Sequence, residues 1–220
     1  MAGWHGNVQT MEKSSTEPDG LFALSTVEEC QRVVRVANPA LVSMSAVTYY
    51  SGFRVLDDRF SSWLHGTYQQ QILPGLLAAV RYGSDEKGYE LLESDALILR
   101  NATDLLRHGS GRAGRLLLRE GIPAGVKCLQ KIHQAASQGR AEAHLATVFG
   151  ARCGVFSIGE RAAALAYVYL ELRTGAPDWH DSHLQEKLAD AAEVIGHFFQ
   201  RSLPTERDGA VVFDQQKHHG

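Results

Sequence analysis

Residues 143–173 read AHLATVFGARCGVFSIGERAAALAYVYLELR and decide the fold class. The run at 162–170, AAALAYVYL, would be apolar on every side of a helix, and such a helix must lie among other elements rather than at the surface. The preceding letters are helical in pattern as well. We therefore expect two consecutive helices, over residues 141–156 and 159–172, with the second buried at the centre of the protein.

The rest of the chain also carries mainly helical patterns, and its six prolines stand between them as breaks. Ser25-x-x-Glu28 and Thr26-x-x-Glu29 are capping boxes that open a first helix. Further helices are expected over residues 40–51, 57–74, 76–83, 84–106, 111–120, 124–136 and from Asp181 to about Phe198. The sequence thus predicts a single all-α domain, a bundle of about nine or ten helices over residues 21–203. Residues 1–20 are expected to be a flexible leader, and 204–220 a tail that is flexible or ordered by a partner.

Charge and composition exclude several functions. The 220 residues contain 22 Lys and Arg against 25 Asp and Glu, so no strong positive field attracts nucleic acid or an anionic membrane. The longest apolar run, 162–170, is far shorter than the roughly 20 residues that span a bilayer. The N-terminus has no apolar signal region. Three cysteines without a Cys-x-x-Cys pair favour a reducing compartment, which we take to be the cytoplasm.

No catalytic constellation is visible. Residues 109–114, GSGRAG, match a dinucleotide-binding pattern, but the preceding residues are helical rather than a strand. We therefore interpret them as a junction between two helices, with glycines that allow close packing. The Glu-x-x-His motif of dimetal bundles is absent from the sequence. Two groups of residues could help to hold a divalent metal ion, and a solvated surface is the alternative for each. They are the 178–183 cluster (Asp178, His180, Asp181 and His183) and the pair Glu193 and His197. These observations favour binding or assembly over catalysis.

Arginines also gather near the middle of the chain, where a face that is solvated or meets a partner explains them better than nucleic-acid binding does. They are Arg100, Arg107, Arg112, Arg115 and Arg119.

Several blocks, in order along the chain, resemble the urease accessory protein UreF family. They are GFRVLDDRFSSWL at 52–64, LLESDALILRNATDLLRHGSGRAGRLLLRE at 91–120, and the opening stretch at 143–173. Residues that take family positions in this resemblance are Ser110, Gly114, His144, Phe149, Gly150, Tyr167, Tyr169 and Arg173. The chain departs from the family at 42–45, where Val-Ser-Met-Ser stands in place of a Pro-x-Gly-Gly turn, and at 176–179.

The resemblance implies an all-α chaperone rather than an enzyme. Such a protein would dimerise and bridge a UreD/UreH-like protein to a UreG-like GTPase while nickel is inserted into the urease apoprotein. It would hold no cofactor tightly, with nickel only in transit. The partner-binding residues implied are Arg173, His144, Tyr169, Ser110 and Gly114, and His180 and His183 are candidate metal contacts. Two alternatives stay open: a helical small-molecule-binding or regulatory domain, and a metal enzyme that uses the 178–183 cluster.

Overall fold

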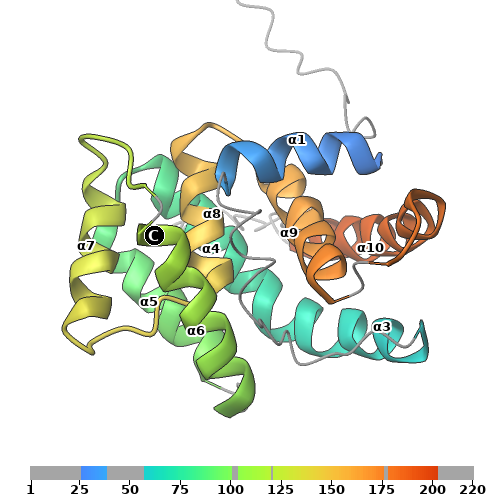
Figure 1. The fold of residues 1–220 in the computed structure, drawn as a ribbon, viewed down its shortest axis with the longest axis horizontal. Coiled ribbons are helices and arrows are strands. Elements are labelled where there is room, and N and C mark those ends of the chain that lie inside the picture. Colours follow the sequence, from blue (N-terminus) through green and yellow to red (C-terminus); the bar gives the residue numbers. More distant parts are fainter. Residues whose placement is uncertain (1–25, 39–56, 101–103, 120, 176–177, 203–220) are drawn as a thin grey trace, which may run out of the picture.

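The computed structural model describes residues 26–38, 57–100, 104–119, 121–175 and 178–202, and in these ranges every regular element is helical (Figure 1). The all-α fold class is therefore confirmed. In chain order the elements are α1 (Val27–Ala37), α3 (Asp57–Trp63), the π-helix η2 (Leu64–Ile72), α4 (Leu73–Ser84), α5 (Gly88–Leu99), α6 (Asp104–Arg119), α7 (Lys127–Ser137), α8 (Leu145–Val155), α9 (Glu160–Gly175) and α10 (Asp181–Ser202).

Helices α3, η2 and α4 follow one another without a break, so the described residues form eight continuous helical segments, slightly fewer than the nine or ten expected. The sequence predicted an end near Pro74, but the helix continues through it. The wider turn of η2 makes this possible, since Leu73 donates its N–H to the carbonyl of Tyr68 and Pro74 then falls in the first turn of α4.

Helix α8 is the centre of the packing, with contacts to α1, α4, α5, α6, α7 and α9 (Figure 1). Glycines bring α4 and α8 unusually close together. A Cβ added to Gly154 would lie 2.0 Å from the carbonyl oxygen of Val80, and one added to Gly83 would lie 2.2 Å from that of Ala151. Only a residue without a side chain fits at either contact.

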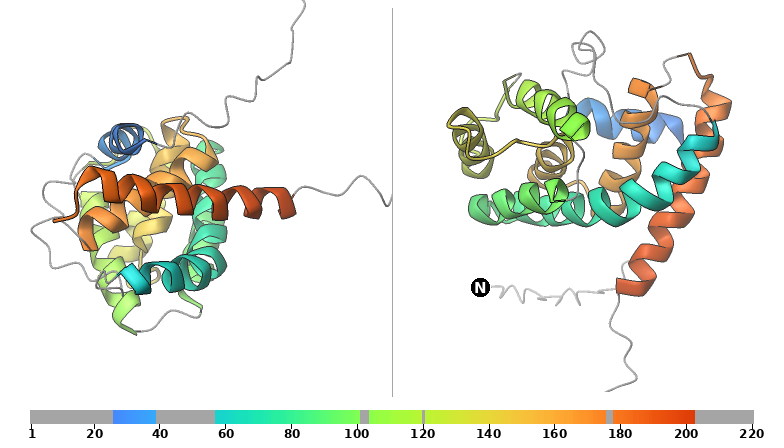
Figure 2. Two further views of the ribbon diagram at one scale, coloured as in Figure 1. Left: turned by 90° about the vertical axis from the view of Figure 1, so that its right-hand side faces the viewer. Right: turned by 90° about the horizontal axis from the view of Figure 1, so that it is seen from below.

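Helix α9 has ten consecutive buried residues, from Ala163 to Leu172, which confirms that the apolar run at 162–170 belongs to the core. It packs between α1 and α10, and the hydroxyl of Tyr68 donates a hydrogen bond of 2.8 Å to the carbonyl of Ala164. The C-terminal turns of α10 project beyond the other described helices (Figure 2). Helix α8 has the wider range of neighbours, so it rather than α9 holds the central position.

Two expectations about the middle of the chain are wrong. The helix expected over 84–106 is divided, because α5 ends at Leu99 and α6 begins at Asp104. The glycines at 109–114 are not a junction, since α6 runs through them. The close packing expected of these glycines is confirmed, because a Cβ on Gly114 would lie 1.9 Å from the carbonyl oxygen of Ala143. The predictions for residues 1–20, 40–51 and 204–220 lie outside the described residues.

The glycine contact between α4 and α8 predicts a strong effect of a single methyl group. Gly154→Ala should lower the free energy of unfolding by about 1–3 kcal/mol, because the methyl would overlap the α4 backbone. Gly196→Ala is the matched control: nothing lies within 4 Å of a Cβ there, so it should raise stability by roughly 0.5–1 kcal/mol through helix propensity. Urea denaturation measures both, and equal effects of the two variants would contradict this packing.

Candidate functional site

The predicted site residues fall into two separate clusters. Ser110, Gly114 and His144 gather where α6 meets the start of α8. Tyr169 and Arg173 lie near the end of α9, and His180 and His183 follow at the start of α10. The first cluster is buried and the second is partly exposed, so the two can do different things.

A buried carboxylate organises the first cluster. Asp95 of α5 is only 2% exposed and accepts three backbone N–H groups just before α8, from Glu142 at 3.1 Å, Ala143 at 3.0 Å and His144 at 2.6 Å. A carboxylate suits this place, because the N-terminal end of a helix presents unpaired donors and a partial positive charge. Sequence reasoning did not single out Asp95. The feature of the sequence that could have indicated it is an acidic residue on the same helix face as the apolar Leu91 and Ile98.

The predicted residues complete this arrangement. The hydroxyl of Ser110 accepts the N–H of Leu145 at 3.0 Å, and the Nδ1 atom of His144 accepts the N–H of Ala146 at 3.1 Å as the N-cap of α8. Gly114 lets α6 approach the same segment. The geometry gives these three residues a positioning role, and their contact with a partner stays a prediction.

Burial shifts the pKa of both titratable groups of the cluster. Burial raises the pKa of Asp95, and its three backbone hydrogen bonds oppose that rise. Burial lowers the pKa of His144 to about 3, so the imidazole is neutral at physiological pH. Its Nε2 atom is buried and has no hydrogen-bond partner among the described residues.

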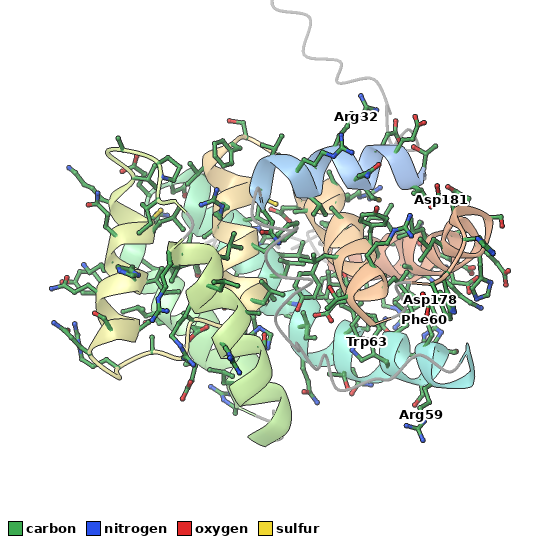
Figure 3. All side chains as sticks on the ribbon, in the orientation of Figure 1. Arg32, Arg59, Phe60, Trp63, Asp178 and Asp181 are labelled. Carbon is green, nitrogen blue, oxygen red and sulfur yellow. The ribbon has the colours of Figure 1, made fainter. Side chains whose placement is uncertain are left out.

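The second cluster centres on the guanidinium of Arg173. Nε donates to the hydroxyl of Tyr169 at 3.2 Å, Nη1 donates to the carbonyl of Trp179 at 3.2 Å, and Nη2 pairs with the carboxylate of Asp181. Asp181 projects at the α9–α10 end of the molecule (Figure 3). Arg173 thereby connects the end of α9 to the start of α10. Its side chain is 29% exposed and that of Asp181 72%, so this corner can be reached by another protein.

The two histidines lie beside this corner. His180 is exposed, whereas His183 packs edge-on against Trp179 with ring centres 4.2 Å apart, and its Nδ1 atom lies 3.6 Å from the carboxylate of Glu186. In the part of the chain that the structure describes, no group of three or more His, Cys, Asp or Glu residues is placed to hold a metal ion. The metal contacts of His180 and His183 stay predictions.

The cysteines offer no activated nucleophile. Cys30, Cys128 and Cys153 are all buried. Burial raises the pKa of each thiol, that of Cys30 to about 12. A thiol with a raised pKa is protonated near neutral pH and reacts poorly.

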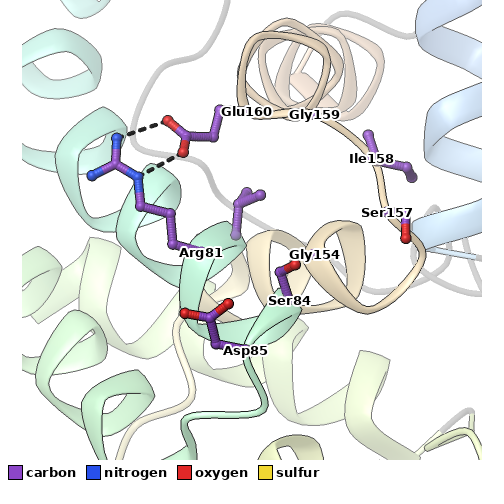
Figure 4. A pocket seen from close by; sticks show the side chains of 9 residues that line it. Arg81, Ser84, Asp85, Gly154, Ser157, Ile158, Gly159 and Glu160 are labelled. Atoms are coloured by element: carbon purple, nitrogen blue, oxygen red, sulfur yellow. Dashed lines mark hydrogen bonds and ion pairs between the residues drawn. The ribbon is translucent and has the colours of Figure 1, made fainter. Parts of the chain in front are cut away.

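A hollow of about 520 Å³ opens between α4 and the turn before α9 (Figure 4). Arg81 and Glu160 meet across it in a two-pronged ion pair, with Nε 2.6 Å and Nη2 2.8 Å from the two carboxylate oxygens. Because each charge already satisfies the other, the hollow offers no free charged group from this pair. We assign it a packing role between α4 and α9.

Together these features define an all-α protein whose polar residues position helices internally and form one accessible, charged corner. Among the described residues, no helix is long and apolar enough to cross a membrane. Residues 57–174, more than half of the chain, match the model of the UreF family, and the chain belongs to that family of urease accessory proteins. The match includes Ser110, Gly114, His144, Tyr169 and Arg173. No curated protein and no solved structure matches the chain.

The buried, neutral His144 predicts how stability depends on pH. Since its pKa is lowered to about 3 in the folded chain, the unfolded chain takes up the proton first as the pH falls below about 6.5. The contribution of His144 to the free energy of unfolding is therefore fully present above about pH 6.5. It falls by up to about 1.4 kcal/mol per pH unit as the pH is lowered toward 3. His144→Asn retains an N-cap acceptor but cannot take up the proton, so its unfolding free energy should depend less steeply on pH.

His133→Asn is the control, because His133 is exposed on α7. Urea denaturation at several pH values measures both variants. An unchanged pH slope in His144→Asn, or an equal change in the control, would contradict the assignment.

Proposed function

We propose that the chain is an accessory chaperone of urease maturation that bridges a UreD/UreH-like protein and a UreG-like GTPase during nickel insertion into the urease apoprotein. It does so in the cytoplasm, as a homodimer and without catalysis of its own. The observation that carries this proposal is the UreF family match, which includes α9 with Tyr169 and Arg173.

The Arg173 corner supports a bridging role. An arginine that already shares its donors among Tyr169, Trp179 and Asp181 can exchange the exposed Asp181 carboxylate for one supplied by a partner. Such an exchange would change contacts across the α9–α10 connection. A bridging protein needs contacts of this kind, because it can favour one state of a partner only if it binds the two states differently.

Nickel enters the proposal as cargo. The exposed His180 and the nearby His183 could contact a passing ion for a short time, since imidazole is a suitable ligand for nickel.

The small-molecule alternative rested on the aromatic residues of α9. Tyr167 and Tyr169 are buried in the core, where the hydroxyl of Tyr167 is 2.5 Å from the carboxylate of Glu171 and that of Tyr169 bonds Arg173. These partners belong to the chain itself, so the tyrosines give the alternative no specific support.

Binding to the maturation partners tests the proposal. The full chain should form a stable complex with UreD-like and UreG-like proteins from the same source, containing two copies of the chain by size-exclusion light scattering, and GTP should change its composition or stability. Arg173→Ala should weaken partner binding by about tenfold or more, as expected for an arginine near the centre of an interface.

Arg140→Ala is the matched control, since Arg140 is exposed and its guanidinium donates to the side chain of Gln138 in the same loop. A thermal melt of each variant verifies folding. Failure to bind either partner would overturn the bridging proposal, and equal affinities of the two variants would overturn the role of Arg173.

A further inference from the structure

A groove of about 340 Å³ lies between α3 and η2 on one side and α10 on the other. Phe60, Leu64 and Val194 contribute apolar walls, and Figure 3 places Phe60 at the end of the molecule where α3 and α10 meet. These three side chains are at most 5% exposed, so the base of the groove is apolar but exposes little apolar surface to solvent.

The rim of the groove carries uncompensated negative charge. Asp190 and Glu193 line it from α10, and neither has an ion-pair or hydrogen-bond partner among the described residues. Of the residues that the structure describes, no lysine or arginine lines the groove, and its other polar lining residues are Ser61, His65 and His197. An apolar base below two free carboxylates suits a lysine or arginine, whose methylene stem prefers apolar contact while its charged end needs an anion.

Two glycines beside the groove point to the same place. Gly75, Gly83 and Gly154 each have a neighbouring atom within 3 Å of an added Cβ, so packing within the chain explains them. An added Cβ at Gly66 of η2 or at Gly196 of α10 would have no described atom within 4 Å, although each glycine lies inside a helix, where it costs about 1 kcal/mol relative to alanine.

Gly66 directly follows the lining His65, and Gly196 directly precedes the lining His197. Two glycines that weaken their helices, and that packing within the described chain does not explain, therefore adjoin opposite walls of one groove. Glycine at such positions allows another backbone to approach closely. A π-helical turn, such as the one that carries His65, is also frequent at functional sites.

We propose that this groove binds a cationic segment of a partner protein, which seats a lysine or arginine side chain between the apolar base and the carboxylates of Asp190 and Glu193. Gly66 and Gly196 give the partner's backbone room to approach. This inference does not rest on the proposed function, because it follows from the groove alone and its test uses neither UreD-like nor UreG-like protein.

Peptide selection against the full chain identifies what the groove accepts. A display library of random twelve-residue peptides should yield binders enriched in lysine and arginine. Synthetic copies, measured by fluorescence anisotropy, should bind at least tenfold more weakly to the double variant Asp190→Asn with Glu193→Gln. Ser61→Trp should abolish binding, because the indole would fill the groove.

Glu186→Gln is the matched control on α10, as it removes one exposed carboxylate that does not line the groove, and it should change affinity less than twofold. Selected peptides without lysine or arginine, no selected peptides at all, or equal affinities for the double variant and the control would overturn the proposal. Absence of binders would also be the result if a second copy or another segment of the chain filled the groove.

Gly196→Ala separates binding from folding. The variant should raise the midpoint of thermal unfolding by about 2–4 °C, since alanine favours the helix, and yet lower peptide affinity at least threefold. A more stable variant with unchanged affinity would show that no backbone approaches at this glycine and would overturn that part of the inference.

Discussion

The buried carboxylate of Asp95 accepts three backbone N–H groups at the start of α8, and the arrangement of the other helices depends on the place where α8 begins. Removing a carboxylate from water is expensive, and only several good hydrogen bonds offset that cost. The same start is fixed from α6 by Ser110 and by the N-cap of His144. Once α8 is placed, its glycines fix the distance to α4, and the buried Arg152 donates from α8 to the carbonyl of Ala37 at the end of α1.

Buried polar residues and surface charges have different roles in this protein, and this difference explains where binding can occur. The inner polar groups are used to position helices, and two charged sites at the surface lie on α9 and α10. Arg173 holds the connection between these two helices while its exposed partner Asp181 can be exchanged. The carboxylates of Asp190 and Glu193 on α10 have no partner within the described chain. The bridging role proposed above needs an interior that holds its helices in place and charged groups at its edges.

Local patterns predicted the helices well, because an apolar run such as 162–170 and the stripe of the last helix depend only on their own residues.

Prediction from the sequence failed where contacts between distant segments determine the structure. Pro74 was interpreted as a helix end, since nothing local reveals the π-helical turn that accommodates it. The glycines at 109–114 were interpreted as a junction, since their close neighbours near Ala143 are far along the chain. Asp95 was missed for the same reason: a single acid in a helical pattern looks like a surface residue until the three donors that surround it are known. Glu193 and His197 were noticed as a pair, but the opposite wall of their groove comes from η2, which no spacing could indicate.

Hydrogen exchange of the Asp95→Asn variant tests the central claim most directly. Asparagine has the same shape but only one oxygen, so at least one N–H before α8 loses its acceptor. We expect amides of residues 142–148 to lose protection first, by about tenfold or more, while α10 retains its protection. Glu93→Gln, on the exposed side of α5, should change neither. Unchanged protection at 142–148, or a uniform loss over all helices, would contradict the claim that this carboxylate fixes the start of α8.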